Sequence, residues 1–112
     1  MKAEDHLLKA KREEKSTEKL DPEEDAELII EGIHGAAHHY VAYFLQKKHS
    51  EHSDKHDEDF LYLRKHGHRD IMSKFQTLES LRTGNFYGRR TNGERVDEAR
   101  RLLAEIKASI EV

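Results

Sequence analysis

Residues 21–48 read DPEEDAELIIEGIHGAAHHYVAYFLQKK, and this stretch decides the fold. Its apolar side chains recur at spacings of three and four residues, a period that only a helix gathers on one face. The stripe comprises Ala26, Ile29, Ile30, Ile33, Ala37, Tyr40, Val41, Phe44 and Leu45. The sequence therefore predicts one long amphipathic helix that ends near Lys48.

The predicted helix begins with a capping signal. Asp21 suits the N-cap position because its carboxylate can accept hydrogen bonds from the first turn, and Pro22 suits the next position, where no donor is needed. Glu24 falls where a capping box places its acid. We therefore expect the helix to start at residues 21–24. Gly32 and Gly35 lie inside it at a cost of about 1 kcal/mol each, and such small residues would let a neighbouring helix come close.

The rest of the chain predicts further helices and no strand. The predicted helices span residues 59–65, residues 70–81 with Asp70 as the cap, and residues 94–111. Loops are expected at residues 49–57 and 84–93, where polar residues and glycines gather. Residues 1–20 form a charged arm or a weak helix, and residues 21–112 form the bundle. The predicted fold class is all-α, a four- to five-helix up-and-down antiparallel bundle.

Length and composition exclude several classes of protein. The chain has 112 residues, enough for one domain, and no cysteine, which excludes disulfides and thiolate metal sites. No apolar run reaches a membrane-spanning length, so we expect a cytoplasmic protein with no membrane partner. Hydrophobic residues make up 35% and charged residues 38%. Because so few apolar side chains are available for a core, we expect two copies of the chain to bury apolar surface together as a homodimer.

The nine histidines include two pairs with helical spacing. His34 and His38 are one turn apart on the long helix, and His52 and His56 share that spacing near the following loop. Two imidazoles at this spacing can chelate zinc, so a His-rich metal-binding bundle is one alternative function. No HExxH or Glu-x-x-His motif supplies the matching carboxylate. Histidines hydrogen-bonded at the edge of the core are the simpler interpretation, and we predict no cofactor.

The strongest candidate binding site is the arginine-rich stretch at residues 81–90, LRTGNFYGRR. Arginine forks bind phosphate, glycines let backbone N–H groups approach it, and tyrosine stacks on bases. The predicted ligand-binding residues are Arg82, Asn85, Tyr87, Arg89 and Arg90. From Arg82 to Arg101 there are six arginines against three acids. In the alternative interpretation the two aromatics pack on the core and the arginines pair with acids.

Three segments carry a resemblance to a known family. They are IIEGIHGAAHHYVAYFLQKKH (29–49), KHDEDFLYL (55–63) and FQTLESLRTGNFYG (75–88), followed by the closing helix VDEARRLLAEI (96–106). Over about residues 24–110 the chain resembles the HEPN superfamily (higher eukaryotes and prokaryotes nucleotide-binding domain). Arg82 and Tyr87 match the type and spacing of an Arg and a Tyr in that family. The resemblance implies a helical bundle, often a homodimer, that acts beside a nucleotidyltransferase partner.

The RNase members of that family carry an Arg, four to six residues, and then a His, with catalysis at the dimer interface. After Arg82 those positions hold Tyr87, Gly88 and Arg89, so the expected imidazole is missing. His66 and His68 follow Arg64 too closely to fit. No catalytic triad or P-loop can be found either, so we predict no catalytic residue.

The predicted function is a HEPN-like, non-catalytic module. It contacts a nucleotide, RNA or a partner protein through the arginine-rich loop. The enzyme alternative is a metal-independent ribonuclease in which the fold brings His38 or His68 opposite Arg82.

Overall fold

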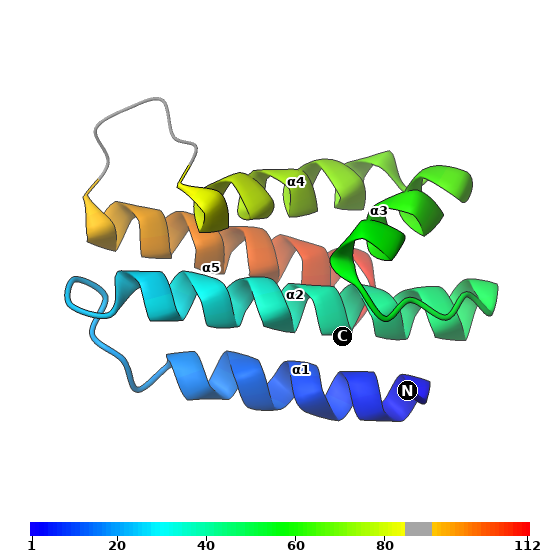
Figure 1. The fold of residues 1–112 in the computed structure, drawn as a ribbon, viewed down its shortest axis with the longest axis horizontal. Helices are drawn as coiled ribbons and strands as arrows, with labels where there is room; N and C mark the ends of the chain where they lie inside the picture. The colour runs from blue at the N-terminus through cyan, green and yellow to red at the C-terminus, as the bar shows by residue number, and fades with distance from the viewer. Residues whose placement is uncertain (85–90) are drawn as a thin grey trace.

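The computed structural model describes residues 1–84 and 91–112, and this part of the chain is an all-α bundle. Its helices are α1 (Ala3–Thr17), α2 (Ala26–His49), α3 (His56–Lys65), α4 (Arg69–Thr83) and α5 (Asn92–Ser109). The four long helices alternate in direction along the chain, and the short α3 crosses near one end (Figure 1). The predicted helical-bundle fold class is confirmed. None of the described helices combines the length and the apolar composition that a bilayer crossing needs.

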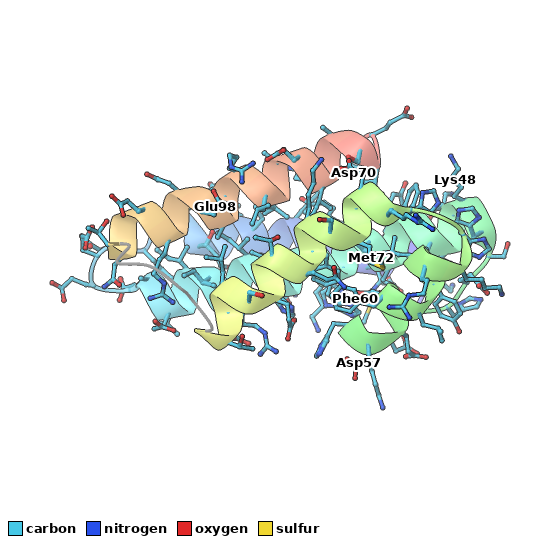
Figure 2. The ribbon with its side chains drawn as sticks, turned by 90° about the horizontal axis from the view of Figure 1, so that it is seen from above. Lys48, Asp57, Phe60, Asp70, Met72 and Glu98 are labelled. Carbon is cyan, nitrogen blue, oxygen red and sulfur yellow. The ribbon has the colours of Figure 1, made fainter. Side chains whose placement is uncertain are left out.

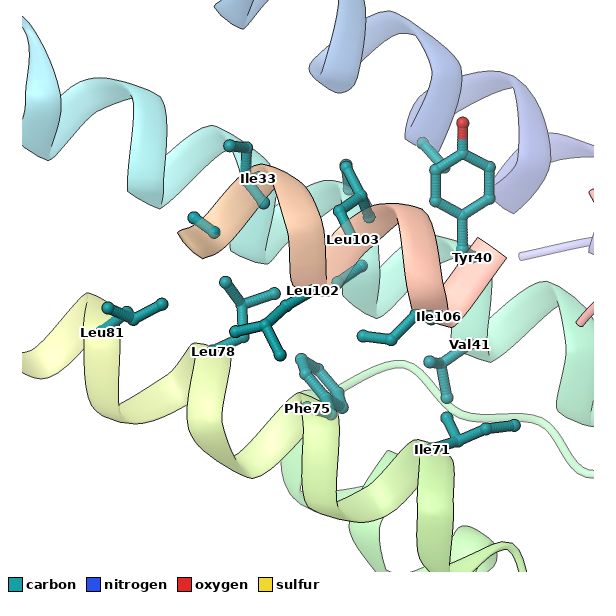
Figure 3. Close-up of a cluster of buried hydrophobic side chains, with 14 of the residues drawn as sticks. Ile33, Tyr40, Val41, Ile71, Phe75, Leu78, Leu81, Leu102, Leu103 and Ile106 are labelled. Atoms are coloured by element: carbon teal, nitrogen blue, oxygen red, sulfur yellow. The ribbon is translucent and has the colours of Figure 1, made fainter. Parts of the chain in front are cut away.

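The long helix α2 is the centre of the bundle, with α1 on one side and α4 and α5 on the other (Figure 1). Every residue of its predicted apolar stripe is buried. Figure 3 shows side chains of α2, α4 and α5 meeting there, among them Ile33, Phe75 and Leu102. Each large apolar side chain that is fully buried stabilises the fold by about 1.5–3 kcal/mol. The stripe therefore places α2 correctly and leaves its more polar edges to face α1 and α3.

The start of α2 corrects the sequence prediction. The helix begins at Ala26, with Asp25 rather than Asp21 as its N-cap residue. Asp21 still acts as a cap, because its Oδ1 accepts from the N–H groups of Glu23 and Glu24 at 2.8 and 3.0 Å. That cap closes a separate turn, since Asp25 leaves helical geometry at φ −113° and ψ 22°. The signal is real but belongs to the turn before the helix.

Other helix starts also differ from the prediction. Helix α3 begins three residues earlier than expected, and Asp70 lies in the first turn of α4 rather than at its cap. Helix α5 begins at Asn92 behind an unpredicted capping box. In it Thr91 Oγ1 accepts from the Glu94 N–H at 3.1 Å, and the Glu94 carboxylate accepts from the Thr91 N–H at 2.9 Å. Gly93 misled the prediction because it lies inside the first turn instead of ending the loop.

The charged N-terminal segment forms α1, a helix that packs along α2. Two glycines of α2 face α1 with no room for a side chain. A Cβ on Gly32 would lie 2.6 Å from Cγ2 of Thr17, and one on Gly35 would meet the carboxylate of Glu13. The small residues do admit a neighbouring helix, as expected. Because that helix is α1 of the same chain, the two glycines give no reason to expect a second copy.

Candidate functional site

A groove of about 330 Å³ opens where α2 faces the start of α3. We call it the histidine groove. It is lined by His34, Gly35, His38, Asp54, Lys55, His56 and Asp57. Three histidines singled out from the sequence therefore share one surface, while His52 is exposed in the loop and lies outside the lining.

His34 is joined to Arg82 by a shared carboxylate. Its Nε2 contacts Oε2 of Glu79, and Oε1 of Glu79 accepts a hydrogen bond of 2.7 Å from Nη2 of Arg82. Burial lowers the pKa of His34 by more than Glu79 raises it, so the imidazole is neutral at pH 7 and donates from Nε2. Burial opposes ionisation of Glu79, but Arg82 and His34 outweigh it and lower the pKa of that carboxyl. The Nδ1 of His34 keeps its lone pair beside a fixed carboxylate and a cation.

A second carboxylate holds His38. Nδ1 of His38 lies 2.5 Å from Oδ2 of Asp59, a residue with no exposed surface. Oδ1 of Asp59 accepts a hydrogen bond of 2.5 Å from the Ser53 hydroxyl. Burial raises the pKa of Asp59, although the hydrogen bonds from His38 and Ser53 partly offset this. The contact fixes the ring of His38 and leaves Nε2 as the nitrogen that Asp59 does not contact.

His56 stands across the groove from His34, at the first residue of α3. The two ring centroids are 5.6 Å apart, edge to face. Nε2 of His56 lies 3.3 Å from Oδ1 of Asp57 and 4.0 Å from Oε1 of Glu79. Two imidazoles thus flank one carboxylate that is bound to an arginine. General acid–base transfer and phosphate binding both use groups of these types.

Of the residues predicted to bind a ligand, Arg82 is the one that the structure describes. Outside the described residues lie Asn85, Tyr87, Arg89 and Arg90. Arg82 occupies the last turn of α4, which ends at Gly84 in the left-handed region at φ 75°. Its Nη1 lies 3.6 Å from Oε1 of Glu31, whose side chain is 63% exposed. Its Nε is buried and has no acceptor among the described residues.

The histidines that the sequence suggested as metal ligands or catalytic partners of Arg82 do not lie together. His34 and His38 are one turn apart, yet each is held by a different carboxylate. Across residues 1–84 and 91–112, no three His, Asp or Glu side chains are placed around a common point for a metal ion. His68 lies at the start of α4, fourteen residues before Arg82, or about 21 Å along the helix axis. The imidazole that is hydrogen-bonded to Glu79, and linked through it to Arg82, is His34.

Sequence analysis missed the carboxylates that organise the groove. Asp59 lies in the acidic run at residues 57–59, and Glu79 is flanked by Leu78 and Ser80, so neither carboxylate stood out in the sequence. Their register was the available signal, because Asp59 is four residues before the buried Leu63 and Glu79 is four residues after the buried Phe75. A carboxylate on the core face of a helix needs a partner, and here the partners are histidines.

A buried imidazole pair behind the groove was missed as well. Nδ1 of His6 in α1 lies 2.8 Å from Nδ1 of His39 in α2, and the residues are 2% and 8% exposed. Burial, helped by the neighbouring His38, lowers the pKa of His39 to about 4, and burial also lowers the pKa of His6. Both rings are therefore neutral at pH 7, one donating and one accepting. No spacing within α2 could reveal this contact, because it depends on how α1 docks.

Comparisons with protein-family models, with curated proteins and with solved structures found no match to this chain. The functional assignment therefore rests on the residues of the groove and on the arginine beside it.

Proposed function

We propose that the histidine groove and the Arg82 end of α4 bind a phosphate-bearing ligand, a nucleotide or RNA, as a HEPN-like module without catalysis. One observation carries this proposal: the guanidinium of Arg82 is held in place but not saturated. Glu79 fixes Nη2 at 2.7 Å, while the contact of Nη1 within residues 1–84 and 91–112 is the longer one to Glu31.

A phosphate can compete for the remaining donors. The ion pair with Glu31 is long and its carboxylate is largely exposed, and such pairs contribute about 0–1 kcal/mol. Phosphate oxygens accept from guanidinium with charge-assisted hydrogen bonds that are about twice as strong as neutral ones. Arg89 and Arg90 follow in the sequence and add two positive charges to the segment after Arg82.

Binding is tested by fluorescence anisotropy with a labelled RNA oligomer and, separately, with labelled ATP. Arg82→Ala should weaken binding by about tenfold or more, as expected for the loss of a charge-assisted contact. The matched control is Arg64→Ala, since Arg64 is exposed on α3. Binding should also weaken steeply with salt. Equal affinity of the two variants and the unaltered protein for both ligands would contradict the proposal.

A second candidate is a metal-independent ribonuclease, favoured by the contact chain from His34 through Glu79 to Arg82. His34 or His56 would take the proton of a 2′-hydroxyl that attacks the adjacent phosphate, and the other would protonate the leaving 5′-oxygen. Arg82 would stabilise the charge that develops on the phosphate. Labelled RNA incubated with the protein and a chelator should then be cleaved, and His34→Asn and Arg82→Ala should each abolish the cleavage. RNA that binds and stays intact excludes this candidate and leaves the binding module.

The same module would act with protein partners. The resemblance to HEPN chains suggests a nucleotidyltransferase partner. The same resemblance and the low content of hydrophobic residues both suggest a homodimer. Light scattering at high micromolar concentration should give twice the mass of the 13.1 kDa chain. A mass of one chain at that concentration would count against the dimer.

A further inference from the structure

Helix α1 and the turn after it carry a basic surface on the outside of the bundle. Figures 1 and 2 agree that α1 lies on the side of α2 away from α4. In Figure 2, α4 with Asp70 and Met72 lies in front and α1 lies behind. The exposed side chains that point away from α2 include four cations. We call this surface the α1 basic face, and it consists of Leu8, Lys9, Arg12, Lys15, Ser16 and Lys19.

The helical register turns these cations outward. The buried side chains of α1 face α2, and Ala10 among them has no exposed surface. Arg12 lies two positions after Ala10, which is about 200° around the helix, so it points away from the bundle. Leu8 and Lys15 lie within about 60° of Arg12 on the same side. The packing of α1 on α2 therefore fixes the direction in which the α1 basic face points.

The acids of α1 are used by the rest of the bundle, whereas the cations of the α1 basic face are not. Glu4 pairs with Lys47 of α2 at 3.3 Å, and Glu14 pairs with Lys107 of α5 at 3.0 Å. Within the part of the chain that the structure describes, none of the four cations has a carboxylate at ion-pair distance. Residues 9–19 hold five cations against three acids, although the whole chain carries a net charge of −3. The sign of the charge is therefore reversed locally.

Two shallow hollows follow one another along the α1 basic face. The first has a volume of about 240 Å³ and is lined by Met1, Asp5, Leu8, Lys9 and Arg12. The second has a volume of about 280 Å³ and is lined by Arg12, Lys15, Ser16 and Lys19. Because Arg12 lines both, the hollows are continuous. The second hollow combines three cations with a hydroxyl and no carboxylate, and the acid that lines the first, Asp5, lies near the start of the helix.

The chemistry of this surface fits the phosphates of a duplex better than a membrane or a single strand. A helix that lies in a membrane buries an apolar face, but the apolar face of α1 is packed on α2, and Leu8 is the one large apolar side chain of the α1 basic face. Proteins that bind single strands add aromatic side chains on which bases stack, and residues 1–20 contain no Phe, Tyr or Trp. A duplex keeps its bases stacked inside and needs only cations for its phosphates.

We propose that the α1 basic face binds the phosphate backbone of a double-stranded nucleic acid without reading its sequence. Lys9 and Lys15 lie about 9 Å apart along the helix axis, a length over which duplex DNA presents about five phosphate charges. Every cation of the face can therefore meet a phosphate, and Lys19 extends the contact beyond the end of the helix. This surface is separate from the groove and Arg82, and the inference does not rest on their proposed function.

The test is fluorescence anisotropy of the full chain with a labelled duplex of about 20 base pairs, as DNA and as RNA in separate experiments, over a range of salt concentrations. The variant Arg12→Gln/Lys15→Gln/Lys19→Gln should bind about tenfold or more weakly at about 50 mM salt. The slope of log K against log salt concentration should become shallower by about 2.7, because each phosphate contact contributes about 0.9.

A matched control removes the same charge elsewhere. Lys48→Gln/Arg64→Gln/Arg69→Gln replaces three exposed cations outside α1 and should keep both the affinity and the slope. Arg82→Ala should also keep duplex binding, so that failure of this proposal and failure of the proposed function can be recognised separately. Circular dichroism checks that each variant keeps the helical fold. Binding of one duplex and not the other would support the proposal and identify the kind of nucleic acid.

Several results would overturn the proposal. One is absence of duplex binding by the unaltered protein, a result that depends on no variant. Another is an equal affinity and slope in the α1 variant and the unaltered protein, or an equal loss in the control. Tighter binding to phosphatidylserine vesicles would assign the surface to a membrane, and tighter binding to polyglutamate would assign it to an acidic protein.

Discussion

The histidines of this protein are held in two different ways. In the groove, His34 and His38 each contact a carboxylate. Elsewhere two histidine rings contact each other, His6 with His39 and, at the C-terminal ends of α2 and α3, His49 with His68. A carboxylate partner favours the protonated ring, and Glu79 accordingly raises the pKa of His34 against the larger effect of burial. When two imidazoles contact each other, protonating both rings would place two positive charges side by side, and they would repel. Burial nevertheless lowers the pKa of His34 as well, and it lowers the pKa of His39 to about 4, so acid acts most strongly on the buried pair.

The largest effect should come from removing the buried carboxylate of the groove. Asp59 has no exposed surface, and Asp59→Ala leaves Nδ1 of His38 without its acceptor. It also removes one of the two acceptors of the Ser53 hydroxyl, whose other contact is the Lys55 carbonyl at 3.1 Å. We expect a loss of about 3 kcal/mol in the free energy of unfolding, because buried polar partners are left unsatisfied. Urea denaturation at pH 7 measures it. The control is Asp57→Ala, two residues away and exposed, which should change stability far less. Equal losses would show that Asp59 does not organise the groove.

An intermediate effect should come from acid acting on the buried pair. His39 has a folded-state pKa of about 4 and an ordinary value of 6.5, so between these values the unfolded chain binds more protons. Stability from this group is therefore complete above pH 6.5 and is lost as the pH falls toward 4. From pH 7 to pH 5 the loss should be about 2 kcal/mol from His39 alone.

The comparison with His39→Asn isolates that contribution. Asp59 and Glu13 have raised pKa values and act with the opposite sign at low pH, since the folded state then holds the extra protons. These groups are the same in both proteins, and so are the charges of Lys9 and His38 nearby. The variant should therefore lose about 2 kcal/mol less than the unaltered protein between pH 7 and pH 5. Parallel pH profiles would rule out the buried pair as the acid-sensitive element.

The smallest effect should come from neutralising the other groove carboxylate. Glu79→Gln keeps the size of the side chain and removes the charge that raises the pKa of His34, so that pKa should fall further. We expect a loss of about 1 kcal/mol in stability, since a charge-assisted contact becomes a neutral one. Nuclear magnetic resonance titration of His34 measures the pKa. An unchanged or higher value would show that Glu79 does not tune this imidazole.

The sequence predicted what depends on local periodicity. The stripe of α2 was correct in every member because burial of one helix face leaves a direct trace in the spacing of apolar residues. The start of α2 was wrong because Asp21 and Asp25 are both capable caps and only geometry selects between them. Local patterns thus found the helices and misplaced some of their ends.

The candidate site was less accessible to such patterns. His34 and His38 could be singled out by their spacing, but their partners come from α3 and α4 and are fixed by packing. His6 gave no signal, since its contact with His39 joins residues 33 positions apart. Side-chain pairs across helices leave no period in the sequence, so the groove had to be seen in three dimensions.

The docking of α1 has a consequence for assembly. Helix α1 itself makes the contacts with the glycine face of α2. The short connection at residues 18–25 determines that α1 packs on the α2 of its own chain. If two copies exchanged α1, each α2 would regain the same neighbour, including the His6–His39 contact, without any new surface. A domain-swapped dimer is therefore within reach of this fold, and acid that separates the two imidazoles would favour the exchange.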